Sequence, residues 1–120
     1  MLGPFGGPVF FFNRFTMKHI FFICLFFAAF SSHADDVAAG RAKSDTACSL
    51  CHGANGISTL PNAPNLAGQQ AIYVAEQLRN YRSGKRQNEI MNVIAKNLTD
   101  SEIAQLGAWF SAIKVNVEIP

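Results

Sequence analysis

The hydrophobic pattern of the chain predicts helices. After residue 35, small and apolar residues recur three or four positions apart in three segments, and no segment alternates as a strand does. We expect helices over residues 36–47 and 69–82 and a third that begins after Thr99. Between the first two, residues 53–68 are rich in Gly, Asn and Pro and predict an ordered loop. On each helix, one set of residues is expected to lie on a single face. In the first helix these are Val37, Gly40 and Ser44; in the second Ile72, Ala75, Leu78 and Arg82, with Val74 and Tyr81 beside them; and in the third Ile103, Leu106, Gly107, Phe110 and Ile113.

Local signals support the second and third helices. Gly84 stands where a helix commonly stops. The sequence from Thr99 to Glu102 is a capping box, in which these two residues satisfy each other's backbone donors. Gly40 and Gly107 lower helix propensity, so we expect each to allow another segment to approach closely. The pattern therefore predicts an all-α fold with three main helices.

The N-terminal part of the chain has the pattern of an export signal. Lys18 and His19 precede an apolar run from Ile20 to Phe30, and small residues up to Ala34 precede an acidic pair. This order is typical of a cleavable secretory signal, so we expect cleavage after Ala34 and a periplasmic location. The run is shorter than the ~20 apolar residues of a membrane span, which disfavours the alternative of a retained anchor.

Residues 1–16 precede this signal and are not needed by it. We therefore expect Met17 to be the true start, residues 1–34 to be an upstream segment with a cleavable signal, and residues 35–120 to be the functional domain. Cys24 lies within the apolar run and would be removed with it.

Charge excludes one class of partner. The full chain has a formal net charge of +2, and Arg14 and Lys18 lie in the part expected to be removed. The remaining acidic and basic residues balance, whereas nucleic-acid binding usually requires a basic excess.

The strongest chemical signal is Cys48-Ser49-Leu50-Cys51-His52. This C-x-x-C-H spacing is the attachment sequence of c-type haem. Two cysteines three positions apart on a helical turn point the same way, so that both sulfurs can bond to the vinyl groups at one edge of a porphyrin. His52 then offers an imidazole nitrogen to the iron. The motif predicts one covalently bound haem c, with Cys48 and Cys51 as thioether anchors and His52 as an axial ligand.

The same residues have three alternative interpretations: a disulfide, a thioredoxin-like redox pair and a zinc site. A disulfide between Cys48 and Cys51 would close a very short, strained loop. A thioredoxin-like pair usually follows a strand, and none is expected here. A zinc site needs four ligands, and after residue 34 the chain offers two cysteines and one histidine, so that a carboxylate would have to complete it.

The second axial ligand is predicted by elimination. After residue 34 the chain contains no other histidine than His52 and no other methionine than Met91. We therefore expect Met91 to bind the iron opposite His52, a pairing that raises the reduction potential. The alternative is that Met91 only fills core space, the common role of methionine, and the iron keeps an open site.

Taken in order, the motifs resemble the class I cytochromes c. They are similar to the small bacterial periplasmic type and to one half of the two-haem periplasmic cytochromes. The residues that carry the resemblance are Cys48 to Gly53, Pro64 to Gln69, Tyr73, Gln77-Leu78, Gly84, Arg86, Met91, Leu98 to Asp100 and Ala108 to Phe110.

The resemblance implies a fold and several residue roles. The fold is that of a class I cytochrome c, with three main helices around one covalently bound haem. Pro64 matches the loop proline whose carbonyl accepts a hydrogen bond from the ligand histidine, and Met91 matches the methionine ligand. Gly40 and Trp109 match the residues at which the first and last helices cross.

With both axial positions filled by the protein, the iron would have no site for a substrate. We therefore expect an electron carrier and not an enzyme. Its partners would be redox proteins that dock transiently, such as a quinol-oxidising complex and a terminal oxidase or reductase. Membrane contact would occur only through these partners unless the signal is retained. The alternatives are a haem enzyme or ligand sensor with an open sixth site, or a fixed subunit of a larger redox complex.

A basic cluster precedes Met91 and has two interpretations. Its members are Arg79, Arg82, Lys85 and Arg86. They either steer an acidic partner toward the haem edge or only suit the C-terminal end of a helix, where positive charge is favourable.

Overall fold

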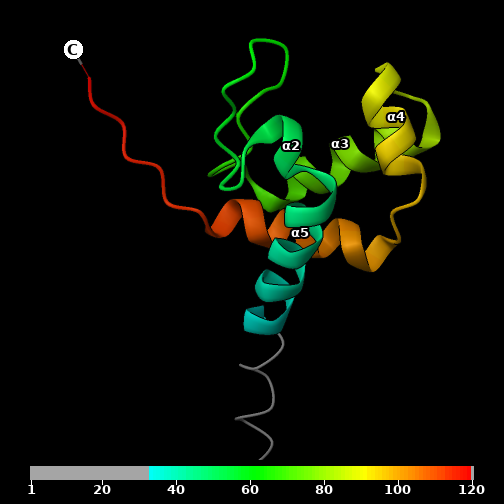
Figure 1. Ribbon diagram of the computed structural model, residues 1–120. Coiled ribbons are helices and arrows are strands. Elements are labelled where there is room, and N and C mark those ends of the chain that lie inside the picture. Colours follow the sequence, from blue (N-terminus) through cyan, green and yellow to red (C-terminus); the bar gives the residue numbers. More distant parts are fainter. Residues whose placement is uncertain (1–32, 120) are drawn as a thin grey trace, which may run out of the picture. The chain divides into compact units, whose positions relative to one another are not determined.

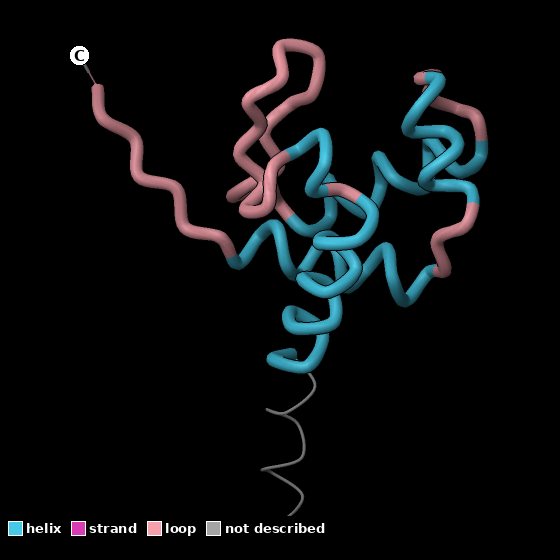
Figure 2. Tube along the Cα trace, viewed as in Figure 1, coloured by secondary structure: helices cyan, strands magenta, loops and turns pink. Residues whose placement is uncertain are grey.

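A computed structural model describes residues 33–119, and all of their regular structure is helical. A first helix covers residues 33–47. It is followed by the elements α2 (Ser49–His52), α3 (Ala71–Ser83), α4 (Glu89–Lys96) and α5 (Asp100–Ala112) (Figure 1). The segment between α2 and α3 is a long loop, and there is no strand within the described range (Figure 2). The predicted all-α fold is confirmed.

The helix boundaries differ from the expected ones in two places. The first helix already includes residues 33–35, ahead of the expected start at residue 36. The sequence pattern also did not predict α4. Its first turn is capped by Asn88, whose side-chain oxygen accepts hydrogen bonds from the backbone N–H groups of Ile90 and Met91 at 3.1 and 2.9 Å. The cap satisfies two of the donors that a helix start leaves unpaired, which allows so short a helix to form.

The core lies between α3 and α5 and is closed by the end of α4. Its buried residues are Val74, Ala75, Leu78, Ala95, Leu98, Ile103, Leu106 and Phe110. The stripe predicted for α5 is confirmed, because Ile103, Leu106, Gly107 and Phe110 are buried. The stripe predicted for α3 is wrong at Ile72, which is 76% exposed; the buried face is centred on Val74 and Leu78 instead.

Two glycines allow close helix contacts, as expected. A Cβ on Gly40 would overlap the backbone carbonyl of Gln105 and would lie 2.9 Å from Cβ of Trp109. A Cβ on Gly107 would lie 2.8 Å from the carbonyl oxygen of Ala71. The first helix therefore crosses α5 at Gly40, and α5 meets the start of α3 at Gly107 (Figure 1).

The capping box at Thr99 also fastens α5 to the first helix. Thr99 N–H donates to Glu102 Oε2 at 2.8 Å, and Glu102 N–H donates to Thr99 Oγ1 at 3.2 Å. Glu102 Oε1 lies 2.6 Å from Lys43 Nζ. The Lys43 ammonium and then the Thr99 donors lower the pKa of Glu102 from 4.5 to about 2.

This lowered pKa predicts a loss of stability in acid. A carboxylate with a depressed pKa in the folded state stabilises it fully above its unfolded pKa of 4.5, and the contribution is lost as the pH falls to about 2. Urea unfolding of the purified protein between pH 5 and pH 2 should show a smaller pH dependence for Glu102→Gln than for the wild type. Glu76→Gln is the matched control, because Glu76 is exposed and has no ion pair within residues 33–119. If the free energy of unfolding changed with pH equally in the wild type and in Glu102→Gln, the lowered pKa of Glu102 would be contradicted.

The predictions for the N-terminal part are not tested by the fold. The signal run, Cys24 and the expected start at Met17 all lie outside the described residues. Within residues 33–119, no helix is both long and apolar enough to cross a membrane.

Candidate functional site

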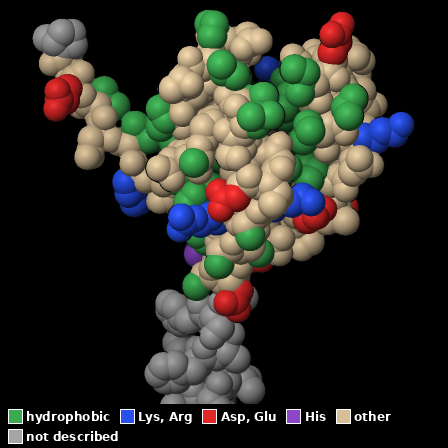
Figure 3. Space-filling view, viewed as in Figure 1, with side chains coloured by type: hydrophobic (Ala, Val, Ile, Leu, Met, Phe, Trp, Pro, Cys, Tyr) green, Lys and Arg blue, Asp and Glu red, His purple; other side chains and the backbone are tan. Residues whose placement is uncertain are grey.

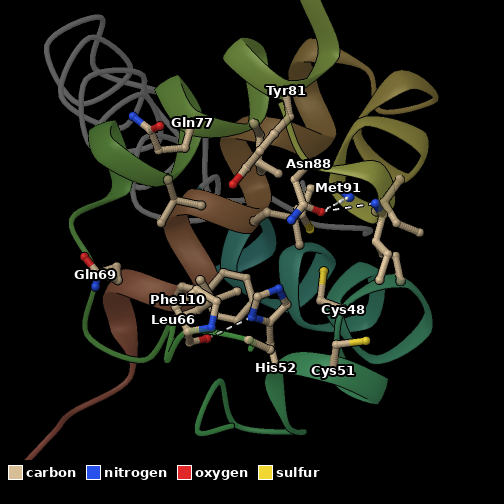
Figure 4. Close-up of a pocket in the computed structure, with 18 of the residues that line it drawn as sticks. Cys48, Cys51, His52, Leu66, Gln69, Gln77, Tyr81, Asn88, Met91 and Phe110 are labelled. Carbon is tan, nitrogen blue, oxygen red and sulfur yellow. Dashed lines mark hydrogen bonds between the residues drawn. The ribbon is translucent and has the colours of Figure 1, made fainter. Parts of the chain in front are cut away.

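The C-x-x-C-H motif lies on a helical turn that follows the first helix. Cys48 N–H donates to Ser44 O at 2.9 Å, and His52 N–H donates to Cys48 O at 2.9 Å. Gly53 then ends the turn with φ of 79°, a conformation that L side chains rarely adopt. Helical geometry therefore places Cys48 and Cys51 on one face and leads directly into His52 (Figure 4).

The imidazole of His52 is held by the loop that follows. His52 is buried, and its Nδ1 lies 2.8 Å from the carbonyl oxygen of Pro64. Because a carbonyl can only accept, Nδ1 carries the proton and donates it, and Nε2 is the nitrogen with a free lone pair. The contact thus fixes both the ring orientation and the tautomer.

The loop itself is held by hydrogen bonds that the sequence did not predict. The carbonyl of Gly56 accepts from Leu66 N–H at 2.7 Å and from Ala67 N–H at 3.0 Å. Ser58 Oγ donates to Cys51 O at 2.9 Å, and Ser58 N–H donates to Asn65 Oδ1 at 2.8 Å. These bonds tie both sides of the loop to each other and to α2, which places the Pro64 carbonyl beside His52. The Asn and Ser residues of this loop were the only available signal, and loop composition does not specify such partners.

Met91 faces the same space from another element. It lies on α4, is partly buried and packs against the hydrophobic core. Figure 4 shows His52 on one side of the space and Met91 on the other. The structure therefore brings together all five residues singled out from the sequence: Cys48, Cys51, His52, Pro64 and Met91.

A cavity of about 520 Å³ lies between these residues. This volume is within the usual range of cofactor sites, about 300–1,000 Å³. Most of the lining is apolar and comes from the loop, α3, α4 and α5, including Leu66, Val74, Leu78, Ile94, Leu106 and Phe110. Two thiols, an imidazole and a thioether in an apolar cavity are a donor set that fits a covalently attached haem.

Polar side chains line one part of the cavity and contact one another. Arg86 Nη1 donates to Gln77 Oε1 at 2.8 Å, and the Arg86 guanidinium lies 4.7 Å from the centre of the Tyr81 ring. All three side chains line the cavity, and Arg86 is the one Lys or Arg among the residues that do. Each of the three residues belongs to a motif or helical pattern of the sequence, but nothing in the sequence predicted that their side chains contact one another at the cavity.

The alternatives for the two cysteines lose support. Both are free thiols and form no disulfide with each other. Burial raises the pKa of the Cys48 thiol to about 11, whereas the reactive thiol of a thioredoxin-like pair has a lowered pKa. No strand precedes the motif within the described range, as a thioredoxin-like site requires. Residues 33–119 also contain no group of three or more His, Cys, Asp or Glu side chains arranged to hold a metal ion.

The basic cluster is divided between two tasks. Arg82 Nη1 donates to Leu98 O at 2.9 Å and Nη2 lies 2.6 Å from Asp100 Oδ1, which ties the end of α3 to the start of α5. This guanidinium lowers the pKa of Asp100. Arg86 is directed to the cavity. Half of the cluster therefore has a partner within the fold, which favours the structural interpretation for Arg82.

Comparisons with known proteins agree with this geometry. Residues 37–114 match the family model described as cytochrome c. The chain is 42% identical over 84 residues to cytochrome c4 of Pseudomonas aeruginosa, covering 70% of this chain and 41% of that protein. It is 39% identical over 82 residues to cytochrome c-554(548) of Halomonas halodenitrificans, covering 66% of this chain and 98% of that protein.

A solved structure gives the same result for the fold. The crystal structure of reduced recombinant cytochrome c4 from Pseudomonas stutzeri superposes with a TM-score of 0.62 at 28% identity, covering 68% of this chain and 50% of that one. The chain thus spans about half the length of the c4 cytochromes that it matches and nearly the full length of cytochrome c-554(548).

Proposed function

Because the chain belongs to the cytochrome c family, we propose that residues 35–120 bind one haem c and carry single electrons between redox proteins of the periplasm. The observation that carries this proposal is the meeting of two thiols, an oriented imidazole and a methionine at one apolar cavity. Export, with removal of residues 1–34, is part of the proposal.

Each residue of the site has a distinct part in holding the haem. Cys48 and Cys51 would form the two thioether bonds, and His52 Nε2 and the Met91 sulfur would bind the iron. When bound, the haem supplies an iron that alternates between Fe(II) and Fe(III). The Pro64 carbonyl, which accepts the hydrogen bond from His52 Nδ1 at 2.8 Å, holds the ring and increases its basicity.

The surroundings of the site favour electron transfer over catalysis. With both His52 Nε2 and the Met91 sulfur bound to it, the iron would have no free site for a substrate. The apolar lining would limit the access of water to a bound haem and, together with a methionine ligand, would favour a raised potential. The protein's contribution is therefore to set the potential and to present the site to partners.

A surface at the cavity suits short encounters with those partners. Leu60, Tyr73 and Ile90 line the cavity and are also exposed. Apolar side chains gather on the face between the loop and α4 (Figure 3). Electron-transfer encounters bury little area, so a small apolar patch is enough. The partner classes we propose are a quinol-oxidising complex as donor and a terminal oxidase or reductase as acceptor.

Ligand binding to the purified protein tests the closed site. We expect one reversible one-electron wave, and little binding of carbon monoxide to the ferrous form or of cyanide to the ferric form at neutral pH. Rapid binding of either ligand would contradict the carrier and indicate a haem enzyme or ligand sensor. Purification as part of a stable larger assembly would indicate a fixed subunit.

A further inference from the structure

Asn92 follows Met91 on α4 but faces another part of the molecule. It is half buried and does not line the cavity, whereas Met91 does. Neighbouring residues on an α-helix point about 100° apart, so Asn92 is directed away from the space into which Met91 extends. Any effect of Asn92 on the site must therefore be indirect, through α4 or through the residues that Asn92 contacts.

The side-chain amide of Asn92 makes three hydrogen bonds, all of them to backbone groups. Nδ2 donates to Tyr81 O at 2.6 Å and to Arg86 O at 2.9 Å. Oδ1 accepts from Asn88 N–H at 2.6 Å. An amide has two donor hydrogens, and both are used. A flipped amide would place its oxygen against two carbonyl oxygens, so the orientation is unambiguous.

These three bonds join separate segments around the start of α4. Tyr81 lies near the end of α3, Arg86 lies in the connection, and Asn88 caps α4. Asn88 in turn accepts from the backbone N–H of Met91 at 2.9 Å (Figure 4). One side chain thus bonds the first turn of α4 both to the end of α3 and to the connection, and an eight-residue helix has little stability of its own.

We propose that Asn92 is a positioning residue that clamps the first turn of α4 to the end of α3 and so holds Met91 across the cavity from His52. The inference rests on the proposed function, because it takes Met91 as the axial ligand. Loss of the clamp would let the first turn of α4 move away and expose the iron to external ligands.

Two substitutions and a control separate this role from general destabilisation. Asn92→Ala removes all three bonds, and Asn92→Asp keeps the acceptor for Asn88 N–H but removes both donors. Asn97→Ala is the matched control, because Asn97 is exposed at the other end of α4 and its side chain has no hydrogen bond to residues 33–119. Far-UV circular dichroism and haem content establish that each variant is folded and loaded.

We expect both Asn92 variants to weaken the sulfur-to-iron absorption band and to bind cyanide about tenfold faster or more, because each variant loses both bonds that the Asn92 amide donates to the α3 end and the connection. Asn97→Ala should match the wild type. A normal band and normal cyanide kinetics in both Asn92 variants would overturn the inference and leave the proposed function intact. Absence of the band from the wild type would instead overturn Met91 ligation, and the inference with it.

A measurement on the wild type covers the case in which the variants do not fold. In the diamagnetic ferrous protein, the side-chain N–H groups of Asn92 should exchange with solvent at least tenfold more slowly than those of Asn97. Both N–H groups of Asn92 are bonded to backbone carbonyls, whereas those of Asn97 are not bonded within residues 33–119. Equal exchange rates for the two side chains would overturn the clamp.

Discussion

Replacement of Cys48 and Cys51 by serine is expected to leave a protein from which acidified organic solvent extracts any haem that remains. A hydroxyl does not form the thioether bonds that hold the haem, so only the axial ligands and the cavity would retain it. Acidified solvent breaks the bond between a histidine and the haem iron, whereas it does not break a thioether. The measurement is the partition of haem absorbance between solvent and protein, compared with the wild type.

The same double variant should also be largely unfolded without haem. The haem would fill a cavity of about 520 Å³ that is lined mostly by apolar side chains, so that without it these side chains would lose a large part of their packing. Far-UV circular dichroism of the haem-free protein should therefore show a large loss of helix.

Leu50 provides the matched control for this experiment. It lies between the two cysteines and is 92% exposed, so Leu50→Ala alters the motif segment without touching the cavity. Leu50→Ala should keep its haem through extraction and should remain folded. Extraction of haem from the wild type would contradict the covalent attachment, and a well-folded haem-free double variant would contradict the structural role of the haem.

Met91→Ala is expected to lower the reduction potential and to open the sixth position of the iron. Thioether sulfur stabilises the ferrous state, and water or hydroxide in its place does so less well. A fall of roughly 0.1–0.3 V would be a moderate part of the ~0.8 V range that axial ligands set. Spectroelectrochemical titration measures the shift, and cyanide or carbon monoxide binding measures the opening.

Val93→Ala on the same helix is the control for Met91→Ala. Val93 is 66% exposed and does not line the cavity, so its truncation should change neither the potential nor ligand binding. If Met91→Ala retained the wild-type spectrum and potential, Met91 would be a packing residue and the iron would have another sixth ligand or none.

The sequence predicted a helix correctly where a cap and a regular apolar spacing both occur within the helix itself. The capping box at Thr99 and the spacing from Ile103 to Phe110 specify α5 without outside help. In contrast, α4 was not predicted. It has only eight residues, and because its apolar Ile90 and Val93 are exposed, its sequence shows no clear buried face. Ile72 was misplaced because α3 turns Val74 and Leu78 toward α5, and the sequence of α3 alone does not indicate which of its apolar residues a neighbour will cover.

The site was predictable to the extent that its chemistry is local. Covalent attachment requires two cysteines and a histidine at fixed spacing, so a short motif is enough to identify Cys48, Cys51 and His52. Met91 followed from the lack of any competing ligand after residue 34. Pro64 came from the family resemblance, since no local rule links it to a histidine twelve residues away. The roles of Arg86, in the connection after α3, and of Asn92, on α4, depend on contacts with α3 that only the fold defines.

The most direct test of the central claim is the absorption spectrum of the purified protein, oxidised and reduced, followed by a pyridine haemochrome assay. The protein should be produced together with a working cytochrome c maturation system. We predict one covalently bound haem per chain, a c-type haemochrome and a sulfur-to-iron band in the oxidised form that is lost in Met91→Ala. A folded protein with no haem absorbance would contradict the account.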